Sequence, residues 1–126
     1  MGLKIKLRPG ENIRFLVRHA DLVRDEQHGR QLRLMGTLAG VSAPRVVYLP
    51  AWFVETFEAA GAELVGGEGG HGHLNMRAAV REWDIALLAR PGFAAAPTYR
   101  VTPVVAGERP APGGLRPVWS ARPASS

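Results

Sequence analysis

Residues 12–25, NIRFLVRHADLVRD, form the longest strand-like stretch of the chain. Ile13, Phe15 and Val17 point to one side of an extended backbone, because side chains alternate between the two faces of a strand. Past His19 this clean alternation breaks down. A break of parity within a long strand is typical of a β-bulge, which bends the strand and lets it serve two parts of a curved sheet. The stretch therefore predicts a long, bent strand in a mostly β fold.

The next segments predict a hairpin and a third strand. EQHGR is a turn, and QLRLMGTLAG resumes the alternation with Leu32, Leu34 and Leu38 on one side. PRVVYLP is a short strand that Pro50 closes, since proline cannot continue a ladder but suits the first turn of a helix. AWFVETFEAAGAEL, residues 51–64, then changes to helical spacing. Phe53, Phe57, Ala60 and Leu64 form its apolar stripe, Glu55, Glu58 and Glu63 its wet side, and Gly61 is a candidate cap.

Later segments predict two more strands, near Trp83 to Arg90 and near Thr98 to Val105, with Leu74 to Val80 open between a strand and a short helix. At the start, LKIKLR alternates as a short strand with one wet face, and Pro9-Gly10 ends it. Lysines on such a strand also protect an edge from pairing with other chains.

The 126 residues suit one small domain, expected over residues 1–106. Residues 107–126 are rich in Pro and Gly and predict a flexible, disordered tail. The tail either has no further role or adds non-specific contacts with nucleic acid. The chain has no cysteine and no run of roughly 18 apolar residues that would cross a bilayer. We therefore expect a cytoplasmic, nucleoid-associated protein without a membrane contact.

Basic residues exceed acidic ones, 16 Lys+Arg against 11 Asp+Glu, which gives a net charge of +5. The excess lies at both ends of the chain: residues 1–50 and 91–126 are basic, and residues 51–90 are acidic. Only Lys4 and Lys6 are lysines, so most cations are guanidinium groups, which bind phosphate bidentately and stack on flat rings. This pattern favours a polyanionic partner, although a GC-rich genome would produce the same arginine bias.

The order of elements is strand, strand, strand, helix, strand, strand, after a small N-terminal strand. This order, with FLVRHADLVRDEQHGRQLRLMGTL as strand, turn and strand and VYLPAWFVETFEAAG as strand and helix, resembles the OB-fold. Over residues 3–105 the chain is similar to small single-stranded DNA-binding proteins of the phage or plasmid kind. The resemblance implies a five-stranded barrel with the helix between strands three and four. It also implies a ligand that crosses strands two and three, between the loops joining strands one to two and four to five.

The stretch LARPGFAAAPTYRV, residues 88–101, would be the second of these loops. Such proteins combine a cationic groove for phosphates with exposed rings on which bases stack. The candidate contacts are Arg14, Arg18, Arg30, Arg33, Tyr48, Arg90, Phe93, Tyr99 and Arg100. Phe93 is either a stacking ring or a plug of the barrel end, and Tyr99 either stacks or packs in the core. Trp52 and Trp83 are expected in the core.

The sequence offers no convincing catalytic site, cofactor site or metal site. His71 and His73 have only Glu68 near them, which makes a partial metal set. His19 and Asp21 are spaced like a general-base pair but lack a nucleophile. Bacterial housekeeping members of the resembled family end in an acidic tail that recruits partners, whereas this chain ends in VWSARPASS. Recruitment through such a tail is therefore not expected.

We therefore expect a non-enzymatic protein that binds single-stranded nucleic acid, DNA before RNA, with weak sequence preference. It would act in DNA replication, recombination or the life cycle of a mobile element. The alternative is a protein-interaction or assembly subunit on the same barrel, whose basic surface is incidental. An exposed edge strand such as Leu3 to Arg8 offers one route to a homo-oligomer.

Overall fold

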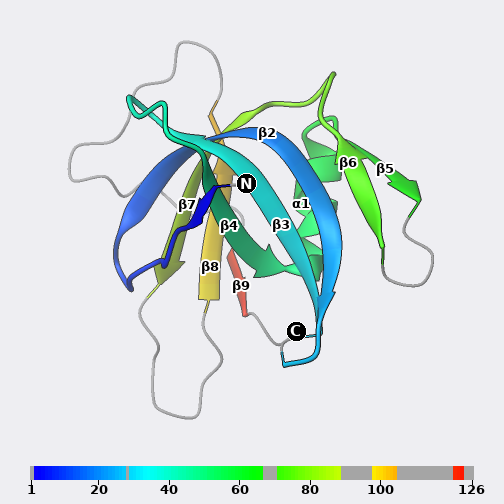
Figure 1. Cartoon of the computed structure of the whole chain (residues 1–126), viewed down its shortest axis with the longest axis horizontal. Coiled ribbons are helices and arrows are strands. Elements are labelled where there is room, and N and C mark those ends of the chain that lie inside the picture. The colour runs from blue at the N-terminus through cyan, green and yellow to red at the C-terminus, as the bar shows by residue number, and fades with distance from the viewer. Residues whose placement is uncertain (1, 28, 67–70, 89–97, 105–120, 124–126) are drawn as a thin grey trace.

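The computed structural model describes residues 2–27, 29–66, 71–88, 98–104 and 121–123 (Figure 1). The described part is mostly β, with one short helix. The elements are β1 (Leu3–Lys4), β2 (Asn12–Asp25), β3 (Gly29–Leu38), β4 (Arg45–Pro50), a 3-10 turn (Ala51–Phe53), α1 (Val54–Ala59), β5 (Glu63–Gly66), β6 (Gly72–Asn75), β7 (Glu82–Leu88), β8 (Thr98–Pro103) and β9 (Ala121–Pro123).

The strands form one sheet in the order β1-β4-β3-β2-β7-β8-β9, with the β5–β6 hairpin joined to it through β2. Strand β2 is the centre of this arrangement. It pairs with β3 on one side, and on the other side its first half pairs with β7 and its second half with β6. In Figure 1, β2 arches across the molecule, and its two halves lead to β7 and to β6.

The predicted break in β2 is confirmed as a bulge at Arg18, where the register with β3 shifts between Val17 and His19. Before it, Ile13, Phe15 and Val17 are buried, and after it Ala20 and Leu22 are buried. The extra residue lets both halves of the strand present an apolar side to the core. The predicted hairpin and third strand are confirmed as β3 and β4.

The helix is shorter than predicted. The expected helix over residues 51–64 begins as a 3-10 turn and ends at Ala59, and Glu63 already belongs to β5. Gly61 has a φ of 106°, a left-handed conformation that ends the helix and turns the chain back. The stretch Leu74 to Val80, predicted as either a strand or a short helix, is mostly neither: Leu74 and Asn75 end β6, and residues 76–80 form a turn.

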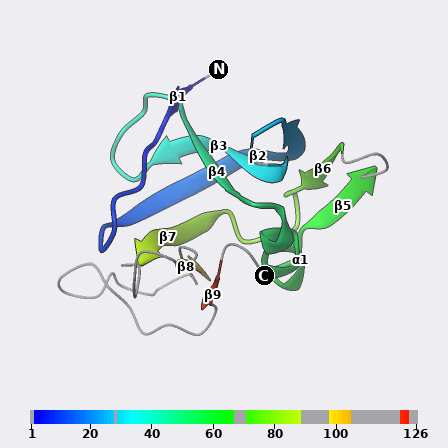
Figure 2. The same ribbon diagram turned by 90° about the horizontal axis from the view of Figure 1, so that it is seen from below.

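The helix brings aromatic side chains into the core. Phe53 and Phe57 are fully buried, and the Phe57 ring stacks on Trp83 with 4.3 Å between ring centres. The Trp83 indole Nε1 donates a hydrogen bond to the Val80 carbonyl oxygen at 2.9 Å. Trp83 is therefore a core residue as predicted, and the partly buried Trp52 packs against the core and stacks on Phe53. Figure 2 shows α1 next to the β5–β6 hairpin.

The sheet is open. Within the described ranges β4 and β8 are not paired, so the closed five-stranded barrel that the resemblance implies stays a prediction. The N-terminal segment crosses this opening. The Ile5 amide donates to the Val46 carbonyl in β4 at 2.7 Å, and the Gly10 amide donates to the Leu87 carbonyl in β7 at 2.8 Å. Because the segment leaves β4 after Ile5, the predicted strand over residues 3–8 is a strand only at β1, which runs parallel to β4.

The expectation of a disordered tail was wrong for Ala121–Pro123. These residues form β9, which pairs antiparallel with β8. The edge of β8 explains the difference, because an uncovered edge leaves backbone groups unpaired, and a short segment from a distant part of the chain satisfies them. Residues 107–120 and 124–126 of the predicted tail lie outside the described residues. Within the described ranges, no helix has the length and the apolar character needed to cross a membrane.

Candidate functional site

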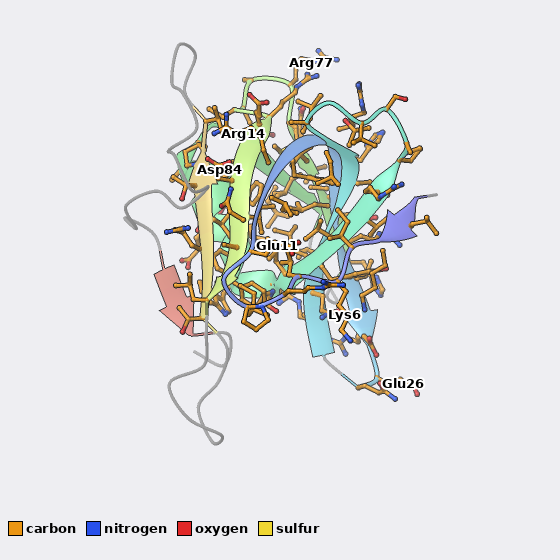
Figure 3. The ribbon with its side chains drawn as sticks, turned by 90° about the vertical axis from the view of Figure 1, so that its left-hand side faces the viewer. Lys6, Glu11, Arg14, Glu26, Arg77 and Asp84 are labelled. Carbon is orange, nitrogen blue, oxygen red and sulfur yellow. The ribbon has the colours of Figure 1, made fainter. Side chains whose placement is uncertain are left out.

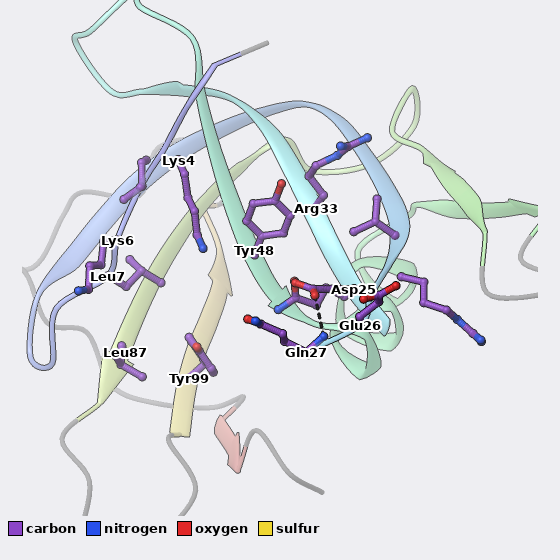
Figure 4. Close-up of a pocket in the computed structure, with 14 residues that line it drawn as sticks. Lys4, Lys6, Leu7, Asp25, Glu26, Gln27, Arg33, Tyr48, Leu87 and Tyr99 are labelled. Carbon is purple, nitrogen blue, oxygen red and sulfur yellow. Dashed lines mark hydrogen bonds between the residues drawn. The ribbon is translucent and has the colours of Figure 1, made fainter. Parts of the chain in front are cut away.

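A groove of about 810 Å³ lies at the opening of the sheet (Figure 4). The N-terminal segment forms one wall, and the end of β2 and the following turn form another. Strand β3 contributes Gln31 and Arg33, and β4, β7 and β8 contribute one side chain each. Three of the predicted contacts line it: Arg33, Tyr48 and Tyr99. The groove therefore joins residues that are up to 95 positions apart in the chain, from Lys4 to Tyr99.

Four side chains form a line across the outer face of the sheet. Tyr48 in β4 is directly opposite Arg33 in β3, Arg33 is opposite Asp21 in β2, and Asp21 is opposite His73 in β6. Directly opposite residues point to the same face, so these side chains lie abreast. The Lys4 ammonium lies over the Tyr48 ring, 5.2 Å from its centre. We call Lys4, Tyr48, Arg33, Asp21 and His73 the transverse row.

An ion pair occupies the middle of this row. Arg33 donates from Nε to Oδ1 of Asp21 at 2.9 Å and from Nη2 to Oδ2 at 2.6 Å. This hydrogen bonding raises the pKa of Arg33, against the opposing effect of partial burial, and the Asp21 charge and Tyr48 add to the rise. The two side chains keep about a quarter of their surface exposed, 24% for Arg33 and 26% for Asp21, so a ligand can reach the pair.

The two tyrosines of the groove differ in their surroundings. Tyr48 is partly buried on the outer face of β4, under the Lys4 ammonium. Tyr99 is also partly buried but packs against the core, and its ring meets Phe53 edge-on at 6.2 Å. Tyr99 therefore takes part in the core packing that we weighed against stacking, while its other side lines the groove. Tyr48 is the better placed of the two rings for a ligand.

Basic side chains outnumber acidic ones along the groove. Lys4, Lys6, Arg24 and Arg33 line it, against the acids Asp25 and Glu26 in the turn after β2. The Asp25 carboxylate accepts a hydrogen bond from the Gln27 amide at 2.8 Å, which stabilises this turn. The lysines come from the N-terminal segment, which leaves the groove with a cationic wall on that side (Figure 4).

A second hollow of about 560 Å³ shares the β2–β3 turn with the groove. Arg24 and Arg30 line it together with His71, and the two arginines are directly opposite each other in the β2–β3 ladder. Like charges in this relation repel, and the acids Asp25 and Glu26, which also line the hollow, offset part of this positive charge. The predicted contact Arg30 therefore lies beside the groove, at the far side of the turn.

Other predicted contacts lie elsewhere, and their grouping with Arg33 was wrong. Arg14 donates from Nε and Nη2 to the two carboxylate oxygens of Asp84 in β7, at 3.0 and 2.9 Å. Asp84 is only 2% exposed and Arg100 only 4%. Register pairing places all three on the outer face of β2, β7 and β8. Figure 3 shows Arg14 and Asp84 together, well away from Lys6.

Arg14 and Arg33 differ in position because each forms an ion pair with a different carboxylate. The carboxylate of Asp84 lies directly opposite Arg14, and its hydrogen bonds raise the pKa of that guanidinium despite partial burial. Arg14 is therefore committed to a structural ion pair. Arg18, at the bulge, is exposed but does not line the groove. Arg90 and Phe93 lie outside the described residues.

The sequence patterns did not identify Lys4, Lys6 and Arg24 as groove residues. The two lysines were expected only to protect an edge, because their alternation shows a solvent-exposed face but not which strand they will meet. The parallel pairing of β1 with β4 joins residues about 40 positions apart, and no local pattern reports it. Arg24 carried a weak signal, since its place before the predicted turn put it near Arg30.

The described residues contain no group of three or more His, Cys, Asp or Glu side chains that could hold a metal ion. His71 and His73 are both exposed, and Glu68 lies outside the described residues. The groove offers the Tyr48 ring, with Lys4 over it and Arg33 in the next strand, which suits a flat, anionic ligand.

Comparison of the chain with protein-family models, with curated proteins and with solved structures found no match.

Proposed function

We propose that this protein binds single-stranded nucleic acid in the groove, DNA before RNA, without catalysing a reaction. One observation carries the proposal. The partly buried Tyr48 ring lies in an open groove, with the Lys4 ammonium over the ring and Arg33 directly opposite in the next strand. A base that stacks on the ring would displace the Lys4 ammonium from it, and the phosphates would then meet Lys4 and the other basic side chains, the combination that strand-binding proteins use.

We further propose that the architecture is of the OB type. Supporting features are the long bent β2, its hairpin with β3, the third strand β4 and the helix that follows it. The groove lies on the outer face of β3 and β4, next to the β2–β3 turn and the ends of β7 and β8. In OB-folds this is the side that binds oligonucleotides.

The transverse row suggests the path of the strand. It runs perpendicular to the strands from β1 to β6, a span of about 19 Å at about 4.8 Å between neighbouring strands. Arg24 and Arg30 extend the cationic surface around the β2–β3 turn. We propose weak sequence preference, because stacking on a ring and contacts with phosphates do not distinguish one base from another. Such a protein would protect or organise single strands in replication, recombination or a mobile element.

The test is fluorescence anisotropy with a labelled oligo-dT of about 20 nucleotides, measured at two salt concentrations, with a duplex of the same length as competitor. We expect binding that weakens steeply as salt rises, because each neutralised phosphate releases counterions. We also expect the single strand to compete better than the duplex, since only unpaired bases stack on a ring. No binding at low salt, or equal competition by the duplex, would contradict the proposal.

One observation favours the alternative function, a protein-interaction subunit. Leu3 is 71% exposed and belongs to β1, the strand at one end of the sheet order. An exposed apolar side chain on a terminal strand is suited to pairing with another chain. Light scattering of the purified protein, with Leu3→Lys for comparison, tests this function independently of nucleic acid. A monomer whose mass does not change with the substitution would argue against self-association through this edge.

A further inference from the structure

Asp21 places a carboxylate in the middle of the transverse row, where a phosphate backbone would be repelled. Its two hydrogen bonds with Arg33, at 2.9 and 2.6 Å, suggest why it is there. We infer that Asp21 is a positioning residue, which fixes the Arg33 guanidinium in the orientation that a nucleotide on Tyr48 requires. This inference rests on the proposed function and assigns a role to an acidic residue of the binding face.

The geometry leaves Arg33 able to bind a ligand while it is held. A guanidinium has five N–H donors in a rigid plane, and Asp21 uses one on Nε and one on Nη2. Three further N–H groups remain, and the Tyr48 hydroxyl, which also hydrogen-bonds Arg33, can accept from one of them. Because two parallel bonds fix the plane of the group as well as its position, the orientation of these three donors is set before a ligand arrives.

The position of the pair makes this arrangement useful. Arg33 is directly opposite Tyr48, so the two side chains leave neighbouring strands side by side on the same face. A base stacked on Tyr48 would have its flanking phosphate, or a neighbouring base, within reach of Arg33. A freely rotating Arg33 would lose side-chain entropy on binding, and the contact with Asp21 has already restricted that freedom.

Two explanations of Asp21 predict opposite signs. If only the summed charge of the face matters, removing this carboxylate strengthens binding of a polyanion and steepens its salt dependence. If Asp21 positions Arg33, removing it weakens binding although the protein becomes more basic. It also makes the salt dependence shallower, because one phosphate contact is lost.

The experiment compares Asp21→Asn with Glu26→Gln in the full chain, using labelled oligo-dT over a range of salt concentrations. Both changes remove one negative charge near the groove and keep the side-chain size, but Glu26 is exposed in the turn after β2, whereas Asp21 holds Arg33. We expect Asp21→Asn to weaken affinity roughly three- to tenfold with a shallower salt slope. Glu26→Gln should strengthen it, and Asp21→Glu should restore part of the loss.

Melting temperatures of all variants show whether the fold is kept, and affinities are compared only at temperatures where each variant is folded. Tighter binding by Asp21→Asn with an unchanged or steeper salt slope, as for Glu26→Gln, would overturn the inference and leave the proposed function intact. Failure of the wild-type protein to bind oligo-dT would overturn the proposed function and the inference together.

Discussion

The Lys4 ammonium lies 5.2 Å from the centre of the Tyr48 ring, so the N-terminal segment contacts the ring that we propose as a stacking surface. A cation in this position is attracted by the negative face of the ring. The contact joins β1 to the outer face of β4 and makes the segment part of the groove. A ligand on Tyr48 would therefore meet a ring and a positive charge at the same point.

Tyr48→Ala should weaken oligo-dT binding by roughly tenfold or more, because one base-stacking contact is lost. Tyr48→Phe keeps the ring and should retain most of the affinity. Anisotropy titrations measure both, and the melting temperature of Tyr48→Ala should fall only slightly, since the ring lies on the outer face of β4. Equal affinity in both variants would show that the ring does not bind the strand.

Replacing Lys4 and Lys6 by alanine should weaken binding and make its salt dependence shallower by about two phosphate contacts. The measurement is the slope of the logarithm of the binding constant against the logarithm of the salt concentration. Arg77→Ala is the control, because Arg77 is exposed and lies far from Lys6 (Figure 3). Similar changes in slope for the control would mean that the positive charge acts diffusely and not through this wall of the groove.

Asp84→Ala should lower the free energy of unfolding by about 2–4 kcal/mol, because it leaves the partly buried Arg14 guanidinium without its two bonds. Urea denaturation measures the loss, with the exposed Glu11→Ala as control. A double-mutant cycle with Arg14→Ala should show coupling between the two residues. Additive effects would show that the pair contributes little.

The pH dependence of this ion pair follows from the direction of the Arg14 shift. The pKa of Arg14 is raised above its ordinary value, chiefly by its hydrogen bonds with Asp84. The stabilisation from this shift is therefore fully present below the ordinary arginine pKa and is lost only as the pH rises through the higher folded value. Between pH 6 and 9, the difference in stability between wild type and Arg14→Ala should stay constant.

Gly36→Ala should destabilise the protein by roughly 1–3 kcal/mol, the usual cost of forcing extra atoms into a packed site. A Cβ atom at Gly36 would collide with the Leu16 carbonyl oxygen and approach the Arg18 amide, where β2 bulges against β3. Thr37→Ala, one residue further along β3, is the control. Thermal denaturation compares the two, and equal stability would show that the bulge can move aside.

The fold follows from local patterns wherever burial repeats with the period of the element. The parity break in β2 and the alternating leucines of β3 were visible in the sequence and are confirmed. The predicted helical stripe is confirmed only in part, since Phe53 and Phe57 are buried but Leu64 lies in β5. The patterns could not show the open side of the sheet. There the edges of β4 and β8 pair with the short strands β1 and β9, which come from distant parts of the chain.

The site was harder to predict for the same reason. Arg14 and Arg33 look alike in sequence, each on the wet side of a strand. Their roles differ because Arg14 is directly opposite the buried Asp84 in β7, whereas Arg33 is directly opposite the partly exposed Asp21 in β2. The partner of each guanidinium is set by strand register over 12 to 70 positions of chain. A tally of arginines identifies a basic protein but not the residues that meet a ligand.

The bulge at Arg18 bends β2 without changing which of its side chains are buried. Val17 and Ala20 are both buried, and the two residues between them, Arg18 and His19, are both exposed. Removing Arg18 alone would leave a regular alternation in which every buried side chain of β2 keeps its present side. Such a deletion would straighten the strand without changing its apolar content, so the arch that holds β6 and β7 on different parts of β2 depends on one surplus amino acid.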